Sequence, residues 1–494
     1  MAKTQGLERV LQRRRAIREG DAGRVARQHR DGKLTARERI EKLLDPGSFV
    51  ELDALLNRDG DYAGVITGSG TVDERPVYVF AQDFTVHGGA MGEQQAQKIC
   101  KLLDLAQTSH APILALCDSA GVRVDEGARA MNAYARIYGR LARLSGVCPI
   151  IALVLGPAVG GAALMTQLAD IAIQAEDVGQ LMVYGPTVVS AMTGKTLSAK
   201  DVGGAKALAE QGGVALTAPN EDAAFALASQ VLALLPSCFH GKTELVDTDD
   251  LNRLLPETDA DDAAALLQGV ADSGTAIELY PAYGGEIRVA LARIGGHSAG
   301  LVVSDARVND GELAPEAAAK AARFIRFCDC FGLPVVSLIN SRGIQVPDEN
   351  SQARAMNAAS KLLYAYAEAA TAKVSVVVGN AIGQAYVAMA GKENADVTYA
   401  WPGAVISALT PEAAVQVLYS KELKAGSGEP LADRAALEEK FSAEVADAVT
   451  AASDGMIDDV IDPAETRKYV IAALELLGGK RRKNPPRRHG NLPL

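Results

Sequence analysis

The chain has 494 residues, of which 48% are hydrophobic and 22% are charged, a composition typical of globular proteins rather than disordered or collagen-like chains. Its length exceeds the ~250–300 residues at which one hydrophobic core stops growing, so two domains are expected. The formal net charge of −11 argues against a nucleic-acid partner, because binding to phosphates depends on clustered Lys and Arg side chains.

The first 45 residues predict a charged, helix-forming arm whose side chains face solvent or pack against a partner subunit. This start lacks the apolar segment of a signal peptide. The longest uncharged stretch, residues 149–165, is shorter than the ~20 residues that span a bilayer. We therefore expect a cytoplasmic protein whose six scattered cysteines are reduced.

Segments of the first half of the chain recur in the second half at a nearly constant offset, which indicates a duplicated fold. The segments that contain Asp83 and Asp305, 222 positions apart, each predict an antiparallel hairpin. Residues 98–121 and 320–343 have the same offset, and each predicts a helix followed by a strand buried on both faces.

A strand, a glycine turn and a helix come next in both halves, beginning at Pro149 and at Lys373. The matching glycines, at an offset of 223, are Gly156 and Gly160 in the first half and Gly379 and Gly383 in the second. Three blocks in the same order therefore support a duplication.

Between the two halves, residues 237–274 carry acidic clusters and prolines that predict an exposed connection. With the boundary near Thr248, the sequence predicts two duplicated α/β domains, residues 1–248 and 249–494.

Two glycine turns, Gly160–Gly161 and Gly383–Gln384, lie where a buried strand ends and a helix begins. Backbone N–H groups at such a place point outward and suit an oxyanion, and small residues let a substrate carbonyl approach. A second donor is expected from the end of the neighbouring strand, at Gly121–Val122 in one half and at Gly343–Ile344 in the other. Preorganised donors of this kind stabilise a developing negative charge by roughly 2.7–4 kcal/mol each. The alternative for each turn is a tight strand-to-helix connection without a ligand.

No side chains in the sequence form a recognisable nucleophile or metal set. There is no Gly-x-Ser-x-Gly elbow and no phosphate-binding lysine loop, and Cys328 and Cys330 are expected to be core residues. The histidines lack the spacing of metal ligands; they are His29, His87, His110, His240, His297 and His489. We therefore expect no metal, and catalysis by backbone electrostatics.

Blocks of sequence along nearly the whole chain resemble the carboxyltransferase family. This family includes the β subunits of propionyl-CoA carboxylases and the α subunits of methylmalonyl-CoA and glutaconyl-CoA decarboxylases. The blocks are RQHRDGKLTARERIEKLLDPGSFVELD (27–53), YVFAQDFTVHGGAMGEQQAQKI (78–99), DSAGVRVDEG (118–127), KLLYAYAEA (361–369), ADVTYAWP (395–402) and the closing RRHGNLPL.

The resemblance implies a crotonase-like ββα spiral in each half and a hexamer with active sites between subunits. The first domain would hold acyl-CoA, with the thioester oxygen near the amides of Gly160 and Gly161. The second would hold biotin, with the ureido oxygen facing the amides of Gln384 and Ala385. Substrate-binding residues would be Ala162, Tyr386 and Val387.

The resemblance also implies the chemistry and the partners. Biotin, carried by a biotin carboxyl carrier protein, would serve as the base, and CO2 would move between it and the α-carbon of a CoA thioester. The further partner would be a biotin carboxylase subunit or a membrane decarboxylase subunit, and the sequence leaves both directions open. Val387 stands where propionyl and acetyl carboxylases often carry Asp, which predicts an apolar or larger acyl group.

The sequence departs from the family pattern mainly in the second half. Asn340 to Pro347 replaces the usual Asp-x-Pro-Gly-Phe-x-Pro-Gly stretch, and Gln384 replaces a glycine. These departures leave open a catalytically silent scaffold for biotin-bearing partners. A crotonase-type hydratase or thioesterase is a further alternative, with Asp125 and Glu126 as its candidate carboxylates.

Overall fold

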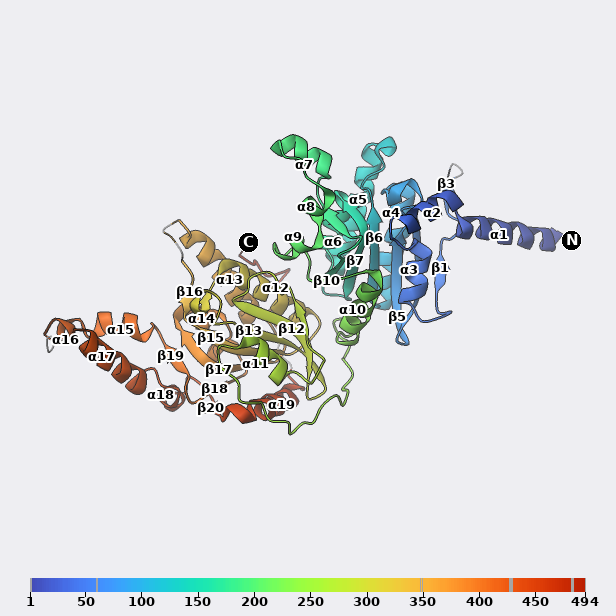
Figure 1. The fold of residues 1–494 in the computed structure, drawn as a ribbon. Coiled ribbons are helices and arrows are strands. Elements are labelled where there is room, and N and C mark those ends of the chain that lie inside the picture. Colours follow the sequence, from blue (N-terminus) through green and yellow to red (C-terminus); the bar gives the residue numbers. More distant parts are fainter. Residues whose placement is uncertain are drawn as a thin grey trace. The chain divides into compact units, whose positions relative to one another are not determined.

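The computed structural model of the chain describes residues 2–58, 61–346, 348, 350–425, 430–480 and 484–493. The chain divides into two compact units, Met1–Lys242 and Thr243–Leu494, each built around its own large sheet (Figure 1). Across the described ranges, no helix combines the length and the apolarity needed to cross a membrane.

The sheet of the first unit has the order β1-β4-β5-β6-β7-β8-β10, with β9 paired to the far end of β7. Strands β1, β4 and β5 are antiparallel, and the strands that follow are parallel. The strands are β1 (Val50–Leu52), β4 (Val65–Val72), β5 (Arg75–Gln82), β6 (Ile113–Ser119), β7 (Ile150–Val159), β8 (Ile171–Ala175), β9 (Gln180–Met182) and β10 (Leu216–Ala218).

The sheet of the second unit repeats this order strand for strand, as β11-β12-β13-β15-β17-β18-β20 with β19 paired to β17. The strands are β11 (Ile277–Leu279), β12 (Ile287–Ile294), β13 (His297–Ser304), β15 (Val335–Ser341), β17 (Lys373–Ile382), β18 (Val397–Ala400), β19 (Val405–Ser407) and β20 (Asp459–Val460). The expected class, two duplicated α/β domains, is therefore confirmed.

The helices that the repeated sequence segments predict are present in both units. Helix α4 (Glu93–Ser109) packs on β4 and β5 and against α5 (Ala128–Leu144), and α12 (Pro315–Cys330) packs in the same way on β12 and β13 and against α13 (Gln352–Glu368). Apolar side chains of these strands and helices form one core in each unit. Short helices follow the glycine turns, α6 (Gly161–Gln167) and α14 (Gly383–Ala388).

Further helices and short strands lie outside these matched blocks. They are α7 (Pro186–Thr193), α8 (Ala199–Gly203), α9 (Ala205–Ala209), α10 (Glu221–Ala233), α15 (Pro411–Leu418), α16 (Ser420–Ala425), α17 (Pro430–Glu444), α18 (Ala448–Ser453), α19 (Thr466–Leu477), β2 (Asn57–Arg58), β3 (Asp61–Tyr62), β14 (Glu312–Leu313) and β16 (Gly343–Ile344).

The duplication extends to a matching irregularity in the central strand pair. The register between β6 and β7 shifts just before Ser119, and the register between β15 and β17 shifts just before Ser341. An added Cβ at Gly156 would lie 2.1 Å from a carboxylate oxygen of Asp118, and one at Gly379 would lie 2.6 Å from the amide of Asn340. The repeated glycines therefore make room for the side chain at each bulge.

The arm at the start of the chain is only partly solvated. Helix α1 (Ala2–Glu19) is largely exposed, as expected, and α2 (Ala22–Arg30) follows it. On α3 (Ala36–Leu43), however, Arg39 is 0% exposed. Arg39 pairs there with the buried carboxylates of Asp118 and Glu221. The prediction of a wholly solvated arm is therefore wrong.

Two smaller expectations also need correction. Residues 237–274 are not wholly an exposed connection, because the apolar run from Ala263 to Val270 forms helix α11, which lies in the second core. Cys328 is buried in that unit, as expected, but Cys330 is exposed at the end of α12.

Lys98 and Lys320 occupy matching places on α4 and α12, and both are almost completely buried. Burial lowers the pKa of each from 10.5 to about 8. Between these values the unfolded chain holds a proton that the folded chain has lost, so stability rises with pH.

We therefore expect the free energy of unfolding to rise from pH 8 to 10.5 more steeply in the wild type than in Lys98→Met. Denaturant titrations at several pH values would measure this difference. If the free energies of unfolding of the wild type and Lys98→Met differed by the same amount at every pH from 8 to 10.5, the pKa of Lys98 would not be lowered by burial.

Candidate active site

The turn after β6 holds one peptide group in a defined orientation. The carbonyl of Gly121 accepts hydrogen bonds from the Met91 N–H at 2.8 Å and from the Tyr134 hydroxyl at 3.1 Å. Because the peptide is planar and trans, the N–H of Val122 points the opposite way. It donates to no acceptor within the described part of the chain. The Gly121 N–H itself donates to the Ser119 hydroxyl at 3.2 Å, so of these two N–H groups it is the Val122 N–H that lacks an acceptor among the described residues.

Gly121 has a φ of +115°, a conformation that glycine adopts readily and that L side chains resist. An added Cβ would be 3.5 Å from its nearest neighbour, the Val159 carbonyl. Backbone conformation, rather than space, therefore requires glycine at this position.

The glycine turn after β7 lies beside this first turn, because β6 and β7 are paired up to Ser119 and Ala158. The N–H of Gly160 donates to the Met182 carbonyl at 2.9 Å. This finding corrects the expectation that Gly160 contributes a donor, since its hydrogen bond joins β7 to β9. The Gly161 N–H opens α6 and has no acceptor among the residues described.

Two tyrosines on α5 contact the glycine turn at Gly161 and hold it in place. The ring of Tyr134 lies where a Cβ on Gly161 would be, 2.6 Å from its closest atoms, and the Tyr138 hydroxyl donates to the Gly161 carbonyl at 2.9 Å. The rings are stacked, with centroids 5.7 Å apart. Internal packing by itself therefore requires glycine at position 161. In the sequence, these tyrosines are marked only as part of an amphipathic helix.

The second unit repeats the arrangement with different side chains. β16 pairs with β14, so that Gly343 and Ile344 stand opposite Glu312 and Leu313. The Gln345 N–H donates to the Leu313 carbonyl at 3.0 Å. In a parallel pair of strands, Leu313 forms its hydrogen bonds with the residues on either side of Ile344. The N–H of Ile344 therefore points away from β14.

The second glycine turn, after β17, starts at Gly383 with a φ of +56°. The N–H groups of Gln384 and Ala385 open α14, and no acceptor for them occurs in the described ranges. The side chain of Gln384 is exposed, so it does not fill the turn. Pro347, in the altered stretch of this unit, lies outside the described residues.

The three expected substrate-binding residues differ in exposure. Val387 is 41% exposed, whereas Ala162 is completely buried in the first core, so only its backbone could contact a ligand. Tyr386 is half-buried, and burial raises the pKa of its hydroxyl.

A buried cluster of charged side chains lies at the end of β6, next to the turn that contains Gly121. Asp118, which is 0% exposed, lies 2.8 Å from Arg39 and 3.0 Å from Lys33. It also accepts a hydrogen bond from Gln28 at 3.1 Å, and Glu221 pairs with Arg39 at 2.9 Å. Burial lowers the pKa of Lys33, although Asp118 opposes that change. The sequence did not predict this cluster.

In the second unit the matching residue is neutral. Asn340 donates to Asp261 at 2.7 Å and accepts from the Asn380 N–H at 2.8 Å. The two units therefore use different side chains to hold the same bulge.

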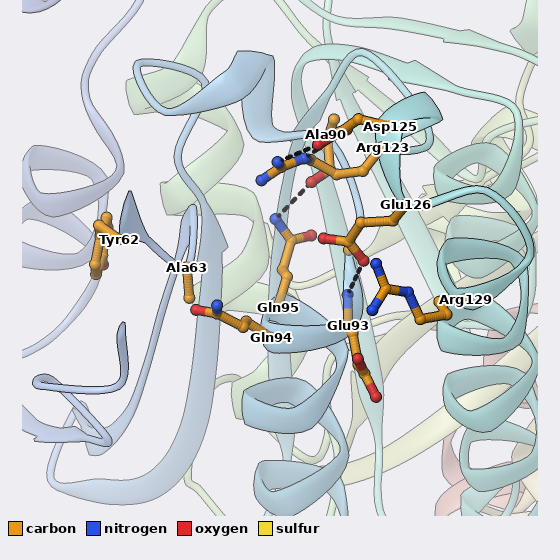
Figure 2. Close-up of a pocket in the computed structure, with 11 residues that line it drawn as sticks. Tyr62, Ala63, Ala90, Glu93, Gln94, Gln95, Arg123, Asp125, Glu126 and Arg129 are labelled. Atoms are coloured by element: carbon orange, nitrogen blue, oxygen red, sulfur yellow. Dashed lines mark hydrogen bonds and ion pairs between the residues drawn. The ribbon is translucent and has the colours of Figure 1, made fainter. Parts of the chain in front are cut away.

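A polar cavity of about 190 Å³ lies beside the first turn (Figure 2). Two of its carboxylates are already engaged: Asp125 pairs with Arg123 at 2.6 Å, and Glu126 accepts from the Glu93 N–H at 2.7 Å (Figure 2). The hydrogen bond from Arg123 lowers the pKa of Asp125, which makes this carboxyl group a weak candidate for a general acid. Neither carboxylate is poised as the hydratase alternative would require.

The duplicated fold with paired strand-end turns has a clear counterpart among known proteins. The model of the carboxyl transferase domain matches residues 27–492. The chain therefore belongs to the carboxyl transferase family, and the expected class of enzyme, a carboxyltransferase, is confirmed.

Similar proteins cover essentially the full length of the chain. The carboxyltransferase subunit of propionyl-CoA carboxylase from Haloferax mediterranei is 38% identical, over 98% of each chain. The α subunit of methylmalonyl-CoA decarboxylase from Veillonella parvula is 37% identical, over 96% of each. A transcarboxylase 12S structure, described as a hexamer with methylmalonyl-CoA and methylmalonic acid bound, superposes with a TM-score of 0.94 at 34% identity, over 99% of this chain and 98% of the other.

Proposed function

We propose that the chain moves CO2 between carboxybiotin and the α-carbon of a short acyl-CoA, of the propionyl-CoA and methylmalonyl-CoA type. The observation that carries the proposal is a repeated pair of backbone donors. The pair is Gly161 and Val122 in the first unit, and Gln384 and Ile344 at the matching places in the second. Each pair is suited to one oxygen on which negative charge develops.

The first unit would bind the acyl-CoA, with the thioester oxygen between the N–H groups of Gly161 and Val122. The transcarboxylase structure with bound methylmalonyl-CoA supports this class of substrate. Asp125 and Glu126, which line the cavity beside this turn, are engaged in other contacts, so neither carboxylate is free to act as a base there. Its contribution would be to orient the thioester and to stabilise the oxygen of the enolate.

The second unit would bind biotin through the N–H groups of Ile344, Gln384 and Ala385. The fit is supported by amides that find no acceptor in the described part of the chain and by an exposed Gln384 side chain that leaves the turn open. When bound, biotin would supply the carboxyl group and accept the α-proton. A carrier protein would deliver it, and the other partner would be a biotin carboxylase subunit or a membrane decarboxylase subunit. A hexamer of this chain, as in the transcarboxylase, would bring the two kinds of site together.

Incubation of the purified chain with methylmalonyl-CoA and free biotin tests this function. We expect release of CO2 that requires biotin and saturates with it. Crotonyl-CoA in place of methylmalonyl-CoA should give no hydration. Turnover that is equally fast without biotin, or hydration of crotonyl-CoA, would contradict the proposal.

A further inference from the structure

A second cluster of reactive side chains lies in the first unit, outside the glycine turns. His110 ends helix α4, and Cys238 and His240 follow α10 near the end of the unit. One ligand atom from each of these three residues lies within 4.8 Å of the other two. The sequence did not predict this cluster because 127 residues separate His110 from Cys238.

The two imidazoles have the spacing of neighbouring metal ligands. The His240 Nε2 and the His110 Nδ1 are 3.3 Å apart, and two nitrogens bound tetrahedrally to one zinc ion lie about 3.3 Å apart. In the metal-free arrangement one of these nitrogens must donate a proton to the other. A metal ion between them would replace that shared proton.

The third group, the Cys238 thiol, adds a ligand that favours zinc. Two imidazoles and one thiolate form a set that zinc accepts, and hard cations such as Mg²⁺ and Ca²⁺ prefer oxygen ligands. Cys238 is 8% exposed, and His240 is exposed, so an ion could enter from the His240 side.

The backbone around the cluster is well defined, which would preorganise the ligands. His110 adopts a left-handed conformation, with φ 54° and ψ 44°, at the end of α4. The Phe239 N–H donates to the Val147 carbonyl at 3.0 Å, and the Gly241 N–H donates to the Cys238 carbonyl at 2.9 Å. These bonds fix the Cys-Phe-His segment next to the loop that leads from α5 into β7.

We propose that His110, Cys238 and His240 bind one zinc ion, with water in the fourth position. The ion joins the end of α4 to the last segment of the first unit, just before the chain passes into the second. Helix α4 ends where β6 begins, whereas the glycine turns follow the other ends of β6 and β7. The zinc site is therefore separate from the proposed chemistry.

Titration of the full-length chain with Co²⁺ tests the proposal, because cobalt bound to a thiolate gives a charge-transfer band in the near ultraviolet. We expect the band to saturate at one equivalent and to disappear when Zn²⁺ is added. The band should be lost in Cys238→Ser and in His240→Ala. It should persist in Cys330→Ser, which removes an exposed cysteine outside the cluster.

Circular dichroism and thermal melting would show that each variant is folded. If Cys238→Ser failed to fold, His240→Ala, a change at an exposed side chain, would decide the question. Absence of a band in the wild type would overturn the proposal, and so would a band that survives in folded His240→Ala.

Discussion

Replacing Gly121 by alanine should lower kcat for biotin-dependent decarboxylation about 10²–10³-fold, the loss observed when one oxyanion donor is removed. The added methyl group meets nothing closer than 3.5 Å, so it fits the space. Alanine resists a φ of +115°, however, and relaxation of the backbone would turn the Val122 N–H away from the thioester oxygen. Initial rates at saturating methylmalonyl-CoA and biotin would measure this loss.

The matching change in the second unit, Gly343→Ala, should have an effect of the same order. Gly343 has a φ of +136°, and an added Cβ would meet no atom within 4 Å. Its effect should fall on the biotin side, with a higher KM for biotin and an unchanged KM for methylmalonyl-CoA. Gly121→Ala should leave the KM for biotin unchanged.

Gly332→Ala provides the control for strain alone. Gly332 has a φ of +64°, also with open space at the Cβ position, but it lies at the end of α12, away from both turns. We expect a stability loss of roughly 1–2 kcal/mol and an unchanged kcat. An equal fall in kcat in all three variants would show that strain, rather than the orientation of a donor, limits the reaction.

Asp118→Asn should destabilise the chain by about 3–5 kcal/mol, the cost of removing one partner from a buried ion pair. Asparagine matches the shape of aspartate, so the bulge beside Gly156 keeps its packing. The charge, however, is lost, and among the described residues Glu221 would remain as the buried carboxylate that pairs with Arg39. Denaturant-induced unfolding would measure the change.

Asp222→Asn is the matched control, because Asp222 pairs with Lys42 on the surface, with side chains 66% and 46% exposed. Exposed pairs contribute about 0–1 kcal/mol. If Asp118→Asn cost no more than Asp222→Asn, the buried cluster would not be what holds α3 against the strand that leads to Gly121.

The fold could be predicted from the sequence because its signals are periodic and repeated. Buried strands are uninterrupted apolar runs, and the offset between the halves survives in the structure down to the pairing of individual residues. Tyr78 stands opposite Ile113, for example, as Gly300 stands opposite Val335. The strand-end turns were found for the same reason, since glycines at matching positions mark them in both halves.

Side-chain contacts between distant segments gave no such signal. Arg39 and Asp118 are 79 positions apart, and a basic residue in a charged helix normally predicts solvent exposure. The role of Tyr134 under Gly161 was likewise hidden, because an aromatic residue on an amphipathic helix is ordinarily a core residue. Whether the Gly160 N–H is a free donor depended on its contact with Met182, which only coordinates could show.

A crystal structure of the chain with a methylmalonyl-CoA analogue that cannot lose its carboxyl group would examine the paired donors directly. We expect the thioester oxygen to lie about 2.7–3.1 Å from the N–H nitrogens of both Gly161 and Val122, as an oxyanion hole requires. A thioester oxygen held instead by a side chain or by solvent, with both amides facing other atoms, would contradict backbone stabilisation of the enolate.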